Sequence, residues 1–176
     1  MLKTAGMALV STVGGASGPL YGTAFMQAGK ALAGKTELDA QDLVTILDAF
    51  VAGVQLRGKS VAGEKTMLDA MIPARDAVKA ALDAGKSAKD ALVDGVAAAE
   101  QGVAYTKTII ATKGRASYLG ERSLGHQDPG ATSFTTRLMK SPWACASIVE
   151  SGMRKSLSFV WTRRSRTVSY ARRFTQ

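Results

Sequence analysis

The chain has 176 residues, with 23 Lys plus Arg against 14 Asp plus Glu, which gives a formal net charge of +9. Its 46% apolar and 21% charged residues are typical of a globular domain and exclude wholesale disorder. The single cysteine, Cys145, excludes an intrachain disulfide framework and a cysteine-rich zinc site. No apolar run reaches the roughly 18 residues that a membrane-spanning helix needs.

The positive charge is concentrated at the C-terminal end. Residues 1–133 carry 14 basic and 13 acidic side chains, whereas residues 134–176 carry nine basic side chains and a single acid, Glu150. A strongly basic protein suggests nucleic acid or an anionic membrane as its partner, but here the first three quarters of the chain is nearly neutral. We therefore divide the chain into a domain over residues 1–133 and a divergent basic tail over residues 134–176, for which partial disorder is left open.

The N-terminal run from Ala5 to Val13 follows Lys3 and resembles the start of an export signal. A glycine, a serine and a threonine interrupt this run and leave it only weakly hydrophobic. We therefore expect a cytoplasmic protein.

Apolar residues recur at helical spacing through the next hundred residues, and no sustained strand-like alternation is found. The fold class is therefore all-α, an antiparallel bundle of amphipathic helices with short connections. The predicted helices run from Pro19 to Leu32, from an N-cap at Asp39 or Thr36 to Gly58, from Thr66 to Asp83 with a kink or break near Pro73, and from Ser87 to about Thr112.

Two segments interrupt the helical pattern. Residues 11–18 are small and lead into a helix N-terminus, which is the outline of a phosphate cradle. Because they lack the Lys-Ser/Thr of a Walker A loop and follow no strand, a flexible connector is the alternative reading.

The second segment, residues 113–128, is a long polar loop rich in Gly, Arg and Ser. Arg115 has a guanidinium suited to bidentate phosphate recognition, and a solvated basic loop is the alternative. The loop ends in Asp128 and Pro129, an N-cap followed by proline at the first helical position. His126 is the only histidine, and the carboxylates form no close pair that would hold magnesium.

Three groups of residues together resemble the nucleotide-binding L subunit of dihydroxyacetone kinase, and the resemblance covers residues 1 to about 133. They are Thr12-Val-Gly-Gly-Ala-Ser-Gly-Pro-Leu-Tyr-Gly-Thr23, Arg57-Gly58 with Gly63-Glu-Lys-Thr-Met67, and residues 113–133. The resemblance implies an all-helical barrel that holds ADP or ATP with Mg²⁺ at one end. It also implies transfer of the γ-phosphoryl group to dihydroxyacetone on a separate K subunit or domain. In the phosphotransferase-dependent form, a phosphohistidine protein, the M subunit, recharges the bound ADP.

Carried over position by position, the resemblance implies nucleotide contacts at eight residues and assigns no catalytic residue. These are Ala16 and Ser17 at the phosphates, Gly58 and Met67 at the adenine and ribose, Arg115 as the neutralising cation, and Asp128, Pro129 and Gly130 as the closing segment.

The sequence also departs from that family at both ends. The family's acidic magnesium-binding motif precedes the part that resembles Met1 onward, so no residue here is assigned a metal-ligand role and the barrel is expected to be incomplete at its N-terminus. After Ser133 the sequence diverges, Pro142 is expected to end the last helix, and we hypothesise that the tail arises from an altered reading frame.

Three functions remain open for the chain. The first is the ADP- or ATP-binding subunit of dihydroxyacetone kinase. The second is a non-catalytic binding module that docks the K subunit or a nucleotide weakly. The third is nucleic-acid or membrane-surface binding through the basic tail and its interspersed aromatic residues; we expect neither nucleic acid nor membrane as a partner.

Overall fold

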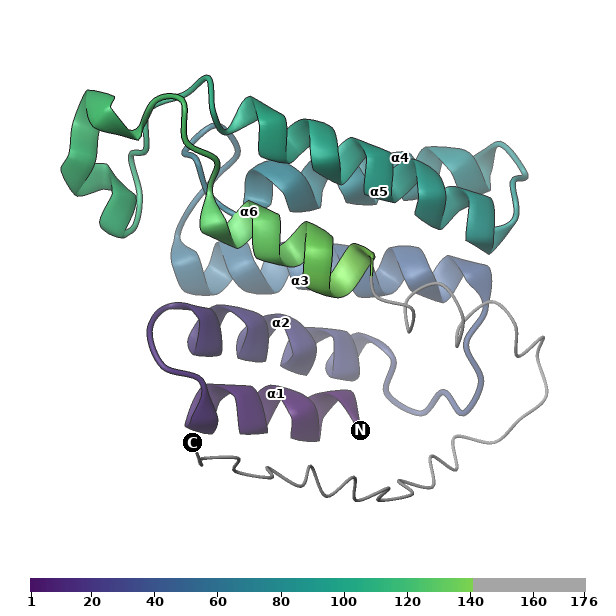
Figure 1. Ribbon diagram of the computed structural model, residues 1–176. Coiled ribbons are helices and arrows are strands. Elements are labelled where there is room, and N and C mark those ends of the chain that lie inside the picture. The colour runs from purple at the N-terminus through teal and green to yellow at the C-terminus, as the bar shows by residue number, and fades with distance from the viewer. Residues whose placement is uncertain (141–176) are drawn as a thin grey trace, which may run out of the picture.

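The computed structural model describes residues 1–140. Pro142, the aromatic residues of the basic tail after Phe134 and most of the tail's charges therefore lie outside the described residues. Residues 1–140 form helices and turns only, which confirms the all-α class (Figure 1). The elements in chain order are α1 (Leu2–Thr12), α2 (Ser17–Ala31), α3 (Ala40–Gly58), α4 (Leu68–Asp83), α5 (Ala88–Tyr105), a 3₁₀ segment η1 (Arg115–Ser123), α6 (Pro129–Ser133) and a π-helical turn η2 (Phe134–Met139). Within this range no helix is both long and apolar enough to cross a membrane.

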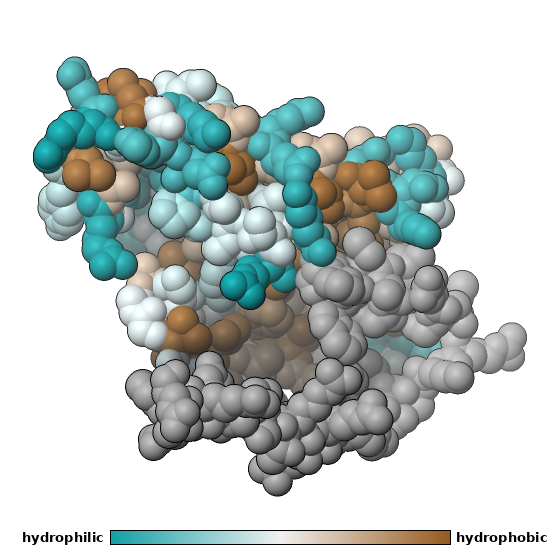
Figure 2. Space-filling view, viewed as in Figure 1, coloured by the Kyte–Doolittle hydropathy of each residue, from teal (hydrophilic) through white to brown (hydrophobic). Residues whose placement is uncertain are grey.

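Each of the first five helices packs against the next, and α6 with η2 returns against α4 and α5. This order places the start of α2, the end of α3 and the start of α6 at the same end of the bundle (Figure 1). The segment η1 projects from the bundle at this end, and its surface mixes hydrophilic with apolar side chains (Figure 2). Tyr118 and Leu119 of η1 are exposed, and so is Leu124, which directly follows it.

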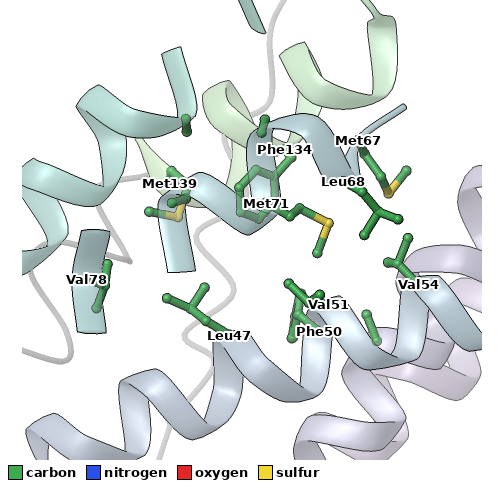
Figure 3. Close-up of a cluster of buried hydrophobic side chains, with 14 of the residues drawn as sticks. Leu47, Phe50, Val51, Val54, Met67, Leu68, Met71, Val78, Phe134 and Met139 are labelled. Carbon is green, nitrogen blue, oxygen red and sulfur yellow. The ribbon is translucent and has the colours of Figure 1, made fainter. Parts of the chain in front are cut away.

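The core lies between α3, α4 and η2, with α2 and α5 closing its sides (Figure 3). Leu68, Met71 and Val78 of α4 and Val54 of α3 are almost completely buried, and Phe134 of η2 is 1% exposed. Burying a side chain of this size stabilises a fold by about 1.5–3 kcal/mol. The packed body therefore continues through η2 to Met139.

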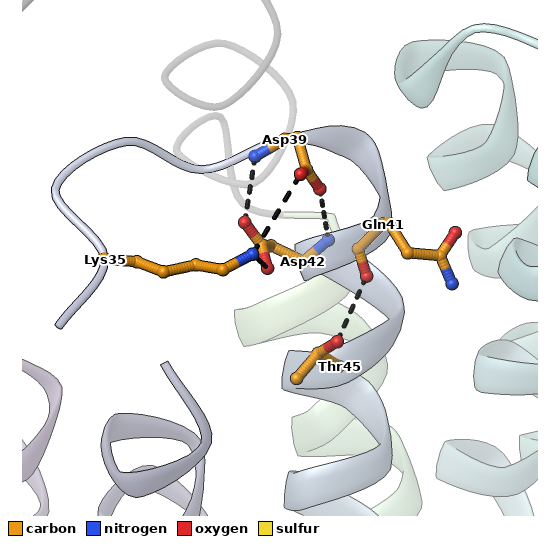
Figure 4. A network of polar contacts seen from close by, with 5 residues as sticks. All are labelled: Lys35, Asp39, Gln41, Asp42 and Thr45. Carbon is orange, nitrogen blue, oxygen red and sulfur yellow. Dashed lines mark hydrogen bonds and ion pairs between the residues drawn. The ribbon is translucent and has the colours of Figure 1, made fainter. Parts of the chain in front are cut away.

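Local sequence signals define α3 as predicted. The Asp39 carboxylate accepts the Asp42 N–H at 2.8 Å while the Asp42 carboxylate accepts the Asp39 N–H at 3.0 Å, which is a capping box (Figure 4). Thr36, the alternative cap, is not used. The helix ends at Gly58, and Lys59 follows it in the left-handed conformation with φ 47°.

Two helices differ from their predictions. α4 runs through Pro73 without a break. Pro73 has no N–H to donate to the Asp69 carbonyl, and α5 passes close to that carbonyl: a Cβ on Gly102 would lie 2.1 Å from its oxygen. α5 ends at Tyr105 instead of near Thr112. It ends early because the Thr106 and Ile109 carbonyls accept hydrogen bonds from the buried ammonium of Lys65.

Candidate functional site

A cavity of about 560 Å³ opens at the end of the bundle where α2, α3 and α6 meet. Its walls also include residues 60–67, which precede α4, and the start of the loop that carries η1. All eight residues singled out from the sequence line this cavity: Ala16, Ser17, Gly58, Met67, Arg115, Asp128, Pro129 and Gly130. The fold thus brings together five separate stretches of the chain. The role of these residues as nucleotide contacts stays a prediction.

The first wall is the start of α2. The connector before it is shorter than predicted, because Ser11 and Thr12 stay in α1, where both hydroxyls donate to the Ala8 carbonyl at 3.0 and 2.7 Å. Ser17 already belongs to α2, and no described side chain caps this helix start. The uncapped N–H groups and the positive end of the helix dipole therefore lie at the cavity wall, where an anion is favoured.

Positive charge dominates the cavity lining. Arg57, Lys65, Lys113 and Arg115 line it, against the single carboxylate of Asp128. Within residues 1–140 the side chains of Arg57, Lys113 and Arg115 have no hydrogen bond or ion pair, so their N–H groups remain available to a ligand. Guanidinium and ammonium groups converging in this way match a phosphate or another multiply charged anion.

Another part of the lining is apolar and narrow. Met67 is 7% exposed, and Leu20 and Val54 lie beside it in the lining. A Cβ on Gly130 would lie 3.2 Å from the Met67 Cβ, and one on Gly58 would lie 3.2 Å from the Leu20 Cδ2. The two glycines therefore keep this wall open, and the polarisable thioether of Met67 suits a flat aromatic ring.

Asp128 lines the cavity and caps the start of α6, and the cap is as the sequence predicts. Its carboxylate accepts the Ala131 N–H at 2.7 Å, and its own N–H donates to the Thr106 Oγ1 at 2.9 Å. Burial raises the pKa of Asp128 above its ordinary value, and the negative charge of Asp69 adds to this. The Ala131 and Gly130 N–H groups and the Lys65 charge oppose the rise without cancelling it.

The remaining features of the long polar loop were only partly predicted. The loop contains η1, and Gly114 and Gly120 take positive φ values of 66° and 54° on either side of its first turn. Arg122 and His126 are exposed and lie outside the cavity lining.

Sequence reasoning missed three of the four cations in the lining. Arg57 and Lys113 each precede a glycine of the recognised motifs, which is a signal that could have identified them. Nothing in the local sequence marks Lys65 as buried, because lysine is usually a surface residue.

The described residues do not by themselves fit a magnesium ion. Residues 1–140 bring together no group of three His, Cys, Asp or Glu side chains, and Asp128 is the one carboxylate in the cavity lining. Magnesium prefers an octahedral shell of oxygen ligands, usually with more than one acidic group or phosphate.

The fold and the cavity define an all-helical domain with a cavity at one end whose lining carries more cations than carboxylates. The family model for the DAK2 domain matches residues 1–140, and the chain belongs to this family. The family-level resemblance read from the sequence motifs is therefore confirmed.

The regions that match named relatives span most of this chain but only part of each relative's own length. The ADP-binding subunit DhaL of the PEP-dependent dihydroxyacetone kinase 1 of Listeria innocua is 50% identical over 133 residues, which are 76% of this chain and 61% of the relative. The ADP-binding subunit DhaL of Escherichia coli K12 is 45% identical over 76% of this chain and 63% of the relative. The human triokinase/FMN cyclase is 34% identical over 76% of this chain and 23% of the relative. The chain thus spans about three fifths of the two bacterial proteins.

Proposed function

We propose that this chain is the ADP-binding subunit of a PEP-dependent dihydroxyacetone kinase and that it holds ADP or ATP in the cavity. One observation carries the proposal: a single cavity joins an uncapped helix start and four cationic side chains to an apolar wall built on Met67. A nucleotide has both parts, a charged phosphate chain and a flat apolar base. The bacterial relatives are named as ADP-binding subunits of this kinase.

The cavity suggests how ADP would lie. The phosphates would meet Ala16 and Ser17 at the start of α2, with Arg115 across from them. The adenine would lie against Met67 between the two glycines, Gly58 and Gly130. Asp128 and Pro129 would close the cavity over the nucleotide. Such a geometry leaves the phosphates nearest the loop that carries η1.

The proposed partners follow from the reaction. The γ-phosphoryl group would pass to dihydroxyacetone held by a K subunit or domain, and a phosphohistidine protein, the M subunit, would recharge the bound ADP. The reaction would take place in the cytoplasm. A Mg²⁺ ion would accompany the nucleotide, where it neutralises phosphate charge.

Calorimetry with ADP and matched arginine variants tests the binding step. We expect Arg115→Ala to weaken ADP binding about tenfold or more, because hydrogen bonds to a charged group contribute about 1.5–3 kcal/mol. Arg122→Ala removes the same charge from the same loop but outside the cavity lining, and should leave the affinity within about twofold. Equal losses in the two variants, or no ADP binding by the unaltered chain, would contradict the proposal.

A second candidate is a protein that binds the nucleotide without transferring its phosphoryl group. The excess of cations over carboxylates in the cavity favours it, because this lining neutralises phosphates without a metal. Calorimetry with and without Mg²⁺, followed by an assay of dihydroxyacetone phosphate with the K subunit added, separates the two. Tight metal-dependent binding with turnover supports the kinase subunit, and metal-independent binding without turnover supports the second candidate.

A further inference from the structure

Lys65 is buried in a way that lysine rarely is. Its residue is 3% exposed, although it lies in the connector between α3 and α4. Its Nζ donates to three backbone carbonyls, those of Thr106 at 2.6 Å, Ile109 at 3.1 Å and Ser123 at 2.5 Å. An ammonium group has three N–H donors, so all of them are in use.

The three acceptors lie at both ends of one excursion of the chain, residues 106–128, which we call the Arg115 loop. Other hydrogen bonds close the base of this loop: the Gly125 N–H donates to the Lys107 carbonyl at 2.8 Å, and the Ala111 N–H donates to the Ser123 Oγ at 3.0 Å. Lys65 thus joins the outgoing and the returning segments of the loop at its closed base, which we call its neck. Beyond the neck the loop carries Arg115 into the cavity.

The backbone around Lys65 is arranged to direct this side chain inward. Lys65 has φ 58°, in the left-handed region that non-glycine residues rarely adopt. The buried Asp69 carboxylate braces the connector by accepting the Gly63 N–H at 2.5 Å and the Thr66 N–H at 2.7 Å. A strained backbone with a dedicated brace indicates that the position of the ammonium matters to the site.

We propose that Lys65 is the positioning residue of the nucleotide site, which holds the Arg115 loop against the cavity through its three carbonyl contacts. The proposal rests on the proposed function for its ligand, but its structural part stands without it. Lys65 also lines the cavity, yet no N–H of its ammonium is left to bond a phosphate. Its effect on the nucleotide therefore acts through Arg115, whose place depends on the neck of the loop.

The experiment compares Lys65→Met with Lys59→Met. Lys59 makes a close control: it is exposed, lies six residues away, has the same left-handed backbone with φ 47°, and does not line the cavity. In the ligand-free chain we expect faster hydrogen exchange over residues 106–128 in Lys65→Met only, with residues 40–58 unchanged. For ADP we expect affinity to fall about tenfold, since buried carbonyls lose their donor and the loop its anchor.

A double-mutant cycle with Arg115→Ala separates positioning from general destabilisation. If Lys65 acts through the Arg115 loop, adding Lys65→Met to Arg115→Ala should weaken ADP binding by no more than about twofold, because the two effects are coupled. Additive losses, or unchanged hydrogen exchange in Lys65→Met, would overturn the proposal. Loss of ADP binding by the unaltered chain would reject the proposed function, while the exchange comparison would still decide the role of Lys65.

A milder variant keeps the test open if Lys65→Met does not fold. Lys65→Gln retains an NH₂ group with two donors and removes the charge. We expect residues 106–128 to exchange faster in Lys65→Gln than in the unaltered chain or in Lys59→Met. The exchange should still be slower than in a fully released loop. Exchange identical to Lys59→Met would overturn the proposal.

Discussion

At the scale of single residues, Asp128 combines a structural and an electrostatic role. As N-cap of α6 it accepts the Ala131 N–H, and as a buried carboxyl in the cavity lining it has a raised pKa. A carboxyl whose pKa is higher in the folded than in the unfolded chain destabilises the fold while it is ionised. That cost is fully present above the folded pKa and disappears as the pH falls below the unfolded value, near 4.

Asp128→Asn tests this role directly. Asparagine caps helices about as well as aspartate but cannot ionise, so the variant should be more stable than the unaltered chain at pH 7. The advantage should shrink as the pH is lowered toward 4, because the unaltered Asp128 then becomes protonated. Urea unfolding of both proteins at several pH values measures the difference. A difference that stays constant with pH, or grows on acidification, would show that burial does not control this carboxyl.

At the scale of elements, the two ends of α3 differ: a capping box stabilises its start, and its last residue lines the cavity. Its first turn holds the capping box of Asp39 and Asp42, joined by Lys35 in an ion pair with Asp42, whereas its last residue, Gly58, lines the cavity (Figure 4). Asp39→Ala removes the cap and should lower the free energy of unfolding by about 1 kcal/mol. ADP affinity should not change, because the cap lies at the far end of the helix.

Denaturant unfolding and ADP calorimetry on the same variant check both halves of that prediction. Gln55→Ala, at an exposed position of the same helix, is the control, and we expect its unfolding free energy to change by less than about 0.5 kcal/mol. A loss of ADP affinity in Asp39→Ala would mean that the two ends of α3 are coupled.

Elements that depend on nearby residues could be predicted from the sequence, and those that depend on remote contacts could not. The N-cap at Asp128 and the start of α5 at Ser87 were predicted correctly, and Asp39 was one of the two caps predicted for α3. These signals can be read from the sequence because a cap bonds within three residues of itself. The end of α5 was not predicted correctly, because it depends on Lys65, which is 41 residues away from Thr106. The same contact explains why the sequence could name Arg115 as a candidate but not the lysine that holds its loop.

At the scale of the whole molecule, the cavity depends on the spacing of helices that contribute little to its lining. α5 supplies no lining residue, yet it packs against the start of α4, where Asp69 braces the connector that carries Lys65 and Met67. The shape of the site therefore depends on how closely α5 approaches α4. The two helices lie close together at Gly102, where a Cβ would lie 2.1 Å from the Asp69 carbonyl oxygen and 2.8 Å from the Ala70 Cα.

Gly102→Ala should force these two helices apart, because the atoms in the way are backbone atoms that cannot rotate aside. Overpacking of this kind lowers the unfolding free energy by about 1–3 kcal/mol or more, whereas the higher helix propensity of alanine raises it by about 1 kcal/mol. Gly95→Ala, in the same helix, is the control and should cost less. Its Cβ would come closest to side-chain atoms, the Val78 Cγ2 at 2.5 Å and the Met139 Cε at 3.1 Å, and the nearest backbone atom, the Ala74 carbonyl oxygen, would be 3.3 Å away. ADP at about 100 times its Kd should raise the unfolding free energy of the unaltered chain by about 2.7 kcal/mol, as measured by urea unfolding. If the wider spacing of the helices distorts the cavity, Gly102→Ala should need more ADP to reach the same rise. An equal rise in unfolding free energy at the same ADP concentration would show that the cavity tolerates a change in helix spacing.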